Sequence, residues 1–173
     1  MDHASAKPQL VYVGDPMCSW CWGYAPVLDR LVTEHDLELR IVLGGLRPGA
    51  AAQPLSPRLK EYLLHHWERI EAGCGQPFDR AALEAREETW MYDTELPAKA
   101  VVAMRRVRPR AELSFFVALQ RAFYADGIDI TDPAVYPALV APFDVDPDEF
   151  ETLLGDPHVG KGAWDDFAAA RQL

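Results

Sequence analysis

The sequence predicts an α/β protein in which one βαβ unit is followed by a region made almost entirely of helices. Two short segments, residues 10–13 and 37–43, have the β-branched and aromatic make-up of buried strands, and glycine ends each of them. Between the two segments, apolar residues recur at helical spacing as far as Glu34. A crossover of this kind makes the two strands parallel and places the start of the helix at the carboxyl end of the first strand.

Two cysteines stand at that helix start. Gly14-Asp15-Pro16 breaks the first strand, and Cys18 and Cys21 then fall in the expected first helical turn. The unpaired N–H groups and the helix dipole there favour a thiolate, which lowers a cysteine pKa from about 8.5 to roughly 3.5–7.5. Residues three apart share a helix face and are within reach of a disulfide. We therefore predict a redox-active dithiol in which Cys18 attacks the substrate and Cys21 resolves the mixed disulfide.

The helix after the cysteines is expected to bury one stripe and to bend once. Pro26 removes a backbone hydrogen bond inside it, so we expect a kink between the first turn and the rest. The apolar stripe comprises Tyr24, Val27, Leu28, Leu31 and Val32.

The residues after the second predicted strand have the apolar periodicity of helices, and proline or aspartate marks where several of these helices begin. Helices are expected near Pro57 and Pro97, with a third carrying Leu113 and Phe116. The expected inner face of the helix near Pro57 is formed by Leu59, Tyr62, Leu63, His66 and Ile70. Three later helices should begin at Asp-Pro pairs, where aspartate caps the helix and proline takes its first position: Asp132-Pro133, Asp146-Pro147 and Asp156-Pro157.

Composition and charge limit the classes of function. With 173 residues and a hydrophobic fraction of 49%, the chain is large enough for one domain with a core. Its net charge of −10 argues against nucleic acid and anionic membranes as partners. Residues 1–8 contain neither a basic nor an apolar leader segment, and three cysteines do not make a disulfide scaffold. We therefore expect a cytoplasmic protein.

The motif around the cysteines resembles that of a known family. Residues 14–24, Gly-Asp-Pro-Met-Cys-Ser-Trp-Cys-Trp-Gly-Tyr, followed by Gly-Gly-Leu-Arg-Pro-Gly at residues 44–49, resemble the DsbA family and in particular its FrnE-like cytoplasmic bacterial branch. The resemblance implies a thioredoxin-like fold with a helical domain inserted after the second strand, and thiol–disulfide oxidoreductase activity without a cofactor. It makes Cys18 the nucleophilic and Cys21 the resolving cysteine.

The resemblance also implies how the chain is divided. Residues 1–52 would form the thioredoxin-like βαβ segment, residues 53–154 the helical insertion, and residues 155–173 a helix returning to the core. Members of the family continue into a cis-proline loop, further strands and a last helix, whereas this sequence ends at Leu173. We therefore expect the C-terminal strands to be missing. A two-stranded sheet leaves unpaired edges, so self-association into a homodimer is a further expectation.

Substrate contacts are expected beside the dithiol. We assign them to Trp20, Trp22 and Pro16, because exposed aromatic residues offer a sequence-tolerant surface to protein or small-molecule thiol and disulfide substrates. Trp20 and Trp22 are two positions apart on a helix and cannot both point inward. The other tryptophans, Trp67, Trp90 and Trp164, are expected in the core.

Three alternative functions are open from the residues alone. A zinc site would need two ligands besides the dithiol, and only Cys74 and scattered histidines are available, so no metal is expected. A glutathione-dependent isomerase or transferase of the kappa-like branch usually has serine in place of the first cysteine and lacks the second. A non-catalytic binding module would use the dithiol only to sense redox state or to hold a metal. Cys74 is interpreted as a bystander, and the basic residues 105–110 as a solvated helix end.

Overall fold

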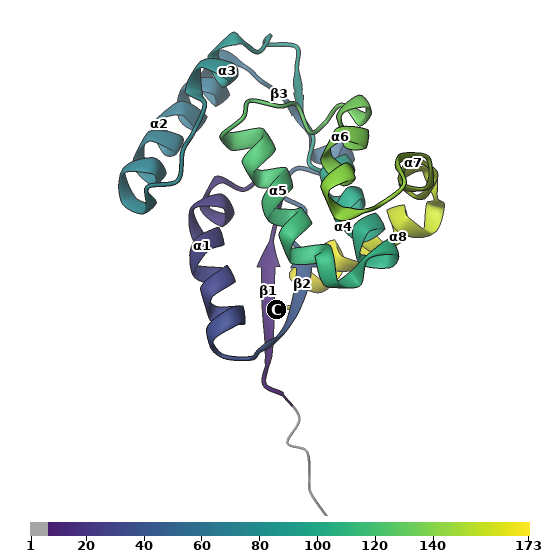
Figure 1. The fold of residues 1–173 in the computed structure, drawn as a ribbon. Coiled ribbons are helices and arrows are strands. Elements are labelled where there is room, and N and C mark those ends of the chain that lie inside the picture. Colours follow the sequence, from purple (N-terminus) through teal and green to yellow (C-terminus); the bar gives the residue numbers. More distant parts are fainter. Residues whose placement is uncertain (1–6) are drawn as a thin grey trace, which may run out of the picture.

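A parallel βαβ unit forms the N-terminal part of the computed structural model, which describes residues 7–173 (Figure 1). Strand β1 (Gln9–Gly14) leads into helix α1 (Ser19–Glu34), which returns the chain to strand β2 (Glu38–Leu43). The two strands pair in parallel, with Gln9 opposite Glu38 and Gly14 opposite Leu43. The predicted α/β class and the βαβ unit are confirmed. Most of the N-terminal stretch considered for a leader, residues 1–6, lies outside the described residues.

Helices make up most of the chain after β2, as the pattern predicted (Figure 1). A two-residue antiparallel ladder, which was not predicted from the sequence, joins β3 (Gln53–Pro54) to β4 (Met91–Tyr92) within this region. The longer helices are α2 (Pro57–Cys74), α4 (Glu95–Val107), α5 (Glu112–Tyr124), α7 (Pro147–Gly155) and α8 (Pro157–Ala170). The shorter helical segments are η1 (Gly49–Ala51), α3 (Arg80–Ala85), η2 (Pro109–Ala111), η3 (Pro133–Val135), α6 (Tyr136–Val140) and η4 (Ala141–Phe143).

Side-chain caps explain where several of these helices begin. Asp146 accepts from the N–H groups of Asp148 and Glu149, and Asp156 accepts from the N–H of His158. Asp132 caps η3, which runs directly into α6, so all three Asp-Pro starts are confirmed. Helix α3 was not predicted. Its cap, Asp79, is followed by arginine rather than proline, and one capping aspartate alone does not distinguish a helix from a turn.

The predicted inner face of α2 is partly wrong. The fully buried residues are Leu63, Trp67 and Ile70, whereas Tyr62 is 52% exposed and stacks on the ring of His66, 3.9 Å between centroids. Helical periodicity allows two overlapping stripes on this helix. The aromatic residues that pack against Trp67 from other elements decide between the stripes, and these are Phe78, Phe123 and Tyr124.

Of the three tryptophans predicted to lie in the core, Trp67 and Trp90 do so and Trp164 does not. Trp67 is buried and Trp90 is half-buried against the core, but Trp164 is 43% exposed on α8. The inner residues of α8 are Val159, Ala163 and Phe167, so Trp164 lies one position beyond the buried stripe. The prediction of a core position for Trp164 was therefore wrong.

An ion-pair network covers the outer edge of β2. Arg105 donates to the carbonyl of Ile41 at 3.0 Å and to the carboxylate of Asp166 at 2.9 Å. The Nε of Arg105 also donates to the carboxylate of Glu112 at 2.7 Å. The N–H of Leu43 donates to Asp166 as well. Side chains of α4 and α8 therefore occupy positions at which a neighbouring strand would bond. Arg105 is thus buried in part, contrary to the prediction that residues 105–110 are simply solvated.

The strand on the other side of the sheet is less covered. Val11 and Val13 of β1 are each about 40% exposed, whereas Tyr12 between them packs edge-on against Phe116 of α5. One face of β1 is therefore partly exposed. The proposed division at residues 52 and 154 stays a prediction. No helix in residues 7–173 is both long enough and apolar enough to cross a membrane.

Candidate active site

The two predicted cysteines lie together at the start of α1. Cys18 is the N-cap residue, with an extended backbone (φ −95°, ψ 114°), and its carbonyl accepts from the N–H of Trp22 at 3.1 Å. Its own N–H donates to the carbonyl of Asp15 at 3.1 Å, so the loop from β1 turns tightly into the helix. Cys21 follows in the first turn. Both cysteines are partly exposed and carry no disulfide.

A buried carboxylate holds this loop in place. Asp15 is 3% exposed and accepts from the N–H of Met17 and the N–H of Leu46, both at 2.9 Å. Burial raises the pKa of Asp15, and these two backbone donors oppose that rise. The carboxylate therefore ties the loop before the helix to the loop after β2. From the sequence, Asp15 is recognisable only as part of the segment that ends the first strand, and nothing local to the motif indicates its distant partner Leu46.

The loop after β2 is tied down at two further points. The Oγ1 of buried Thr94 accepts from the N–H of Arg47 at 3.1 Å. Gly45 has φ +62°, and a Cβ there would lie 2.7 Å from the ring of Phe167 on α8. Only glycine meets both requirements at this position. The Gly-Gly-Leu-Arg segment at residues 44–47 is thus a rigid wall next to Cys18.

Hydrogen bonding between the two cysteines shifts their pKa values in opposite directions. The Cys18 thiol donates to the sulfur of Cys21, and this bond is the largest cause that lowers the pKa of Cys21 to about 7. Burial opposes the lowering, and the hydroxyl of Tyr12 adds a second side-chain donor. The same bond raises the pKa of Cys18, with burial adding to the rise. The helix start acts on both sulfurs, and their neighbours shift the two pKa values in opposite directions.

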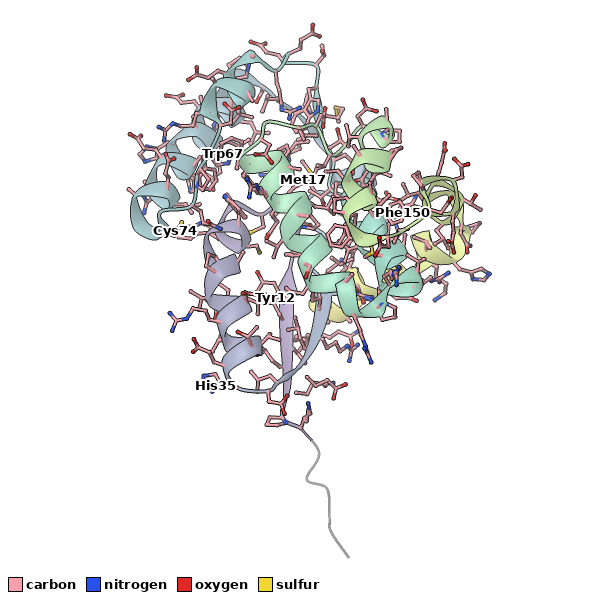
Figure 2. All side chains as sticks on the ribbon, in the orientation of Figure 1. Tyr12, Met17, His35, Trp67, Cys74 and Phe150 are labelled. Atoms are coloured by element: carbon pink, nitrogen blue, oxygen red, sulfur yellow. The ribbon has the colours of Figure 1, made fainter. Side chains whose placement is uncertain are left out.

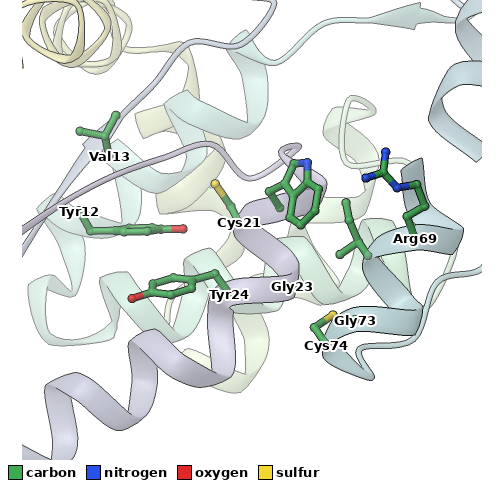
Figure 3. Close-up of a pocket in the computed structure, with 10 residues that line it drawn as sticks. Tyr12, Val13, Cys21, Gly23, Tyr24, Arg69, Gly73 and Cys74 are labelled. Atoms are coloured by element: carbon green, nitrogen blue, oxygen red, sulfur yellow. The ribbon is translucent and has the colours of Figure 1, made fainter. Parts of the chain in front are cut away.

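An open apolar groove lies beside Cys21. Its volume is about 540 Å³, and α1 and α2 contribute most of its walls (Figure 3). The phenol oxygen of Tyr12 points toward Cys21, whereas that of Tyr24 points away (Figure 3). The residues that line the groove are Tyr12, Val13, Trp20, Cys21, Gly23, Tyr24, Arg69, Ile70, Gly73 and Cys74.

A smaller hollow lies beside Cys18. It holds about 120 Å³ and is walled by Leu46, Arg47, Tyr92 and the stacked pair of Tyr62 and His66. Trp20 lines both this hollow and the groove, and it is 58% exposed. The predicted exposed position of Trp20 is in accord with the structure.

The other two predicted substrate contacts are buried. Trp22 is 4% exposed, and its indole Nε1 donates to the carbonyl of Pro77 at 3.0 Å. Pro16 is buried in the loop between β1 and α1. Neither side chain presents a surface to substrate in this structure, so the assignment of contacts to Trp22 and Pro16 needs correction. Tertiary packing against residues after α2 decides which of the two tryptophans turns inward.

The third cysteine, Cys74, is the last residue of α2. Cys74 is exposed (Figure 2), and its sulfur accepts from the N–H of Gln76 at 3.4 Å. It lies beside Gly23 of α1 (Figure 3). Within residues 7–173, no three histidine, cysteine or acidic residues lie together as a metal site would require. His65 is exposed and His66 is half-buried.

The fold recurs in proteins of known structure. A protein from Nitrosomonas europaea, provisionally named a protein disulfide isomerase, is 32% identical and superimposes with a TM-score of 0.87 over 96% of this chain and 79% of its own. The chain belongs to the DsbA family of thiol–disulfide oxidoreductases. The cytosolic disulfide reductase DsbM from Pseudomonas aeruginosa is 27% identical, with a TM-score of 0.82 over 95% of this chain and 77% of its own. The predicted thioredoxin-like fold with a helical insertion is thereby confirmed.

This DsbA-family protein also has relatives named for another role. ClpXP adapter proteins SpxH from Bacillus licheniformis and Halalkalibacterium halodurans are 25% and 23% identical over 96% of the chain. The chain spans 55% and 56% of their lengths, or about half of these curated relatives. No protein-family model matches the sequence. A 2-hydroxychromene-2-carboxylate isomerase, 12% identical with a TM-score of 0.62, shares the fold alone.

Proposed function

We propose that this DsbA-family protein exchanges disulfides with protein or small-molecule thiols through Cys18 and Cys21. The observation that carries the proposal is a pair of hydrogen-bonded thiols on one turn at a helix start, of which one has a pKa of about 7. A dithiol with such a pKa supplies a thiolate at neutral pH. The open groove and the exposed Trp20 lie beside it.

The proposed exchange proceeds in two steps that need no cofactor. The Cys18 proton passes along the hydrogen bond to Cys21 as the Cys18 sulfur attacks a substrate disulfide, which forms a mixed disulfide and releases one substrate thiolate. Cys21 then loses its proton to solvent and attacks the Cys18 sulfur. The second substrate thiolate leaves, so two electrons have passed to the substrate and the protein holds a Cys18–Cys21 disulfide. Oxidation of a dithiol substrate follows the same steps in reverse.

Insulin reduction in the presence of a chemical reductant tests the proposal. We expect Cys18→Ser to abolish turnover, because the attacking sulfur is lost. Cys21→Ser should also stop turnover but should accumulate a mixed disulfide at Cys18, which intact-mass spectrometry detects. Cys74→Ser is the matched control, and its turnover should equal that of the wild type. Turnover that persists in both Cys18→Ser and Cys21→Ser would refute the proposal.

We also propose which partners the protein has, where it acts and that it self-associates. The net charge of −10 supports partners other than nucleic acid and anionic membranes. The DsbM relative is described as cytosolic, which supports a cytoplasmic place of action. The half-covered strand β1 supports self-association, which sedimentation of the purified protein would measure.

Glutathione is a second candidate as the redox partner. One structure of DsbM, 27% identical to this chain, was determined with glutathione. If glutathione serves here, oxidised glutathione should oxidise the dithiol faster than a neutral disulfide of equal potential. Cys74→Ser should leave that ratio unchanged.

A non-catalytic binding module is the third candidate, and the adapter names of the curated relatives favour it. In that case the double variant Cys18→Ser/Cys21→Ser would retain partner binding, and the wild type would show no insulin reduction above the reductant alone. The kinetic experiment above therefore separates an enzyme from an adapter.

A further inference from the structure

Tyr12 is held rigidly at the edge of the dithiol. Its ring lies parallel to that of Tyr24, with 6.2 Å between centroids, and edge-on to Phe116 of α5, also at 6.2 Å. Gly14 leaves room for the ring, because a Cβ at Gly14 would lie 2.6 Å from the Tyr12 Cε1. Two ring contacts, from α1 and α5, and the missing Cβ at Gly14 thus fix where the phenol oxygen lies.

That oxygen is directed at the reacting sulfur. The Tyr12 hydroxyl points toward Cys21 (Figure 3), and hydrogen bonding from Tyr12 is one of the causes that lower the pKa of Cys21. The hydroxyl of the stacked partner Tyr24 points the other way (Figure 3). Burial and the neighbouring sulfurs raise the pKa of Tyr12, so its hydroxyl keeps the proton that it donates.

The importance of this donor changes during the exchange. In the reduced protein, two side chains donate to the sulfur of Cys21, namely Cys18 and Tyr12. Once Cys18 is bound in a mixed disulfide it has no S–H, and Tyr12 is then the remaining side-chain donor. The charge on Cys21 is needed at that moment, because only a thiolate attacks the mixed disulfide.

We infer that Tyr12 is a catalytic hydrogen-bond donor that stabilises the thiolate of Cys21 while the mixed disulfide is resolved. This inference rests on the proposed function. In the resolving step the Cys21 thiolate forms a bond to the Cys18 sulfur, the bond from Cys18 to the substrate sulfur breaks, and its electron pair leaves with the substrate thiolate. In the reverse direction Cys21 is the leaving thiolate, and the same hydroxyl stabilises it.

Other charged and titratable groups surround Cys21 and are the same in the variants below. From the helix start and its preceding loop come Cys18 and Asp15, and α2 contributes Arg69 and Cys74 to the shared groove. Tyr24 of α1 also lines the groove, and Phe116 of α5, which packs on Tyr12, is uncharged. A difference between variants therefore reports the missing hydroxyl.

The test compares Tyr12→Phe with Tyr24→Phe, since each variant loses one hydroxyl and keeps its ring. The ionisation of the reduced dithiol, followed by thiolate absorbance against pH, should shift upward by about one unit in Tyr12→Phe alone. Rapid-quench trapping at pH 6 should show the mixed disulfide resolving roughly threefold more slowly, since thiolate is lost but the more basic thiolate is a better nucleophile. Tyr24→Phe should match the wild type in both measurements.

Each outcome decides the inference. An unchanged midpoint and resolution rate in Tyr12→Phe, while Cys21→Ser stays inactive, would overturn the role of Tyr12 and leave the proposed function standing. Turnover in both cysteine variants would instead overturn the proposed function. If Tyr12→Phe does not fold, an NMR titration of the wild type tests the same contact. The ring signals of Tyr12 should shift with the ionisation of Cys21, and signals independent of it would refute the contact.

Discussion

The two sulfurs of one helical turn face different surroundings. Cys18 adjoins a hollow of about 120 Å³ whose walls are held by buried polar contacts, whereas Cys21 opens onto an apolar groove of about 540 Å³. Both sulfurs lie at the same helix start and experience the same dipole. Their pKa values nevertheless move in opposite directions. The contrast shows that the helix start makes the dithiol reactive, whereas the side chains packed around each sulfur determine the direction in which its pKa shifts.

The largest effect is expected from removing the anchor on the Cys18 side. Asp15→Ala leaves the buried N–H of Met17 and the partly buried N–H of Leu46 without their acceptor, and should lower the free energy of unfolding by about 2–3 kcal/mol. Denaturant unfolding of the reduced protein measures this loss. Asp15→Asn, which keeps one acceptor oxygen, should lose less. Equal stability of wild type and Asp15→Ala would show that the Cys18 side is not held by this carboxylate.

A smaller effect is expected from pH, and it belongs to the Cys21 side. The folded protein depresses the pKa of Cys21 from 9.0 to about 7, so between these pH values the unfolded chain binds more protons than the folded one. The stability of the reduced protein should therefore rise with pH across that window, by about 1.4 kcal/mol for each unit of pKa difference, and be lost as pH falls through about 7. Unfolding measured at pH 6 and pH 8 checks the sign.

The same measurement has an internal control. Cys21→Ser removes the titrating thiolate, so its stability should show no such rise between pH 6 and pH 8. A rise that persists in this variant would assign the low pKa to another group.

The smallest effect on stability is expected from Trp20, which lines both the hollow beside Cys18 and the groove beside Cys21. Trp20 is 58% exposed, so Trp20→Ala should change the free energy of unfolding by no more than about 0.5 kcal/mol. If Trp20 contacts substrate, the KM for insulin should rise about threefold with little change in kcat, since uniform binding is lost. The kinetics of disulfide reduction measure both quantities. An unchanged KM would remove Trp20 from the substrate contacts.

Local signals in the sequence predicted much of the framework. The strand before Gly14, the cysteines at the helix start and the three Asp-Pro helix starts each depend on residues within a few positions of one another. Such features are found in the folded structure as predicted, because capping, strand breaking and helical periodicity depend on residues that are close together in the sequence. The dithiol itself was found in this way.

Other features depend on partners far along the chain and were missed. Asp15 binds the N–H of a residue 31 positions away, and Arg105 reaches the carboxylate of Asp166 across 61 positions. The choice between Trp20 and Trp22 as the inner tryptophan follows from Pro77, which lies 55 positions beyond Trp22. No periodicity in a single sequence encodes these pairings.

By itself, the sequence determined that two cysteines stand one turn apart at the carboxyl end of a parallel strand, because neighbouring residues dictate where a strand ends and a helix begins. Only the tertiary structure decided which sulfur has the lowered pKa, because that depends on donors brought from β1 and on burial by other elements. Desolvation and hydrogen bonding act over a few ångströms in space, whatever the separation along the chain.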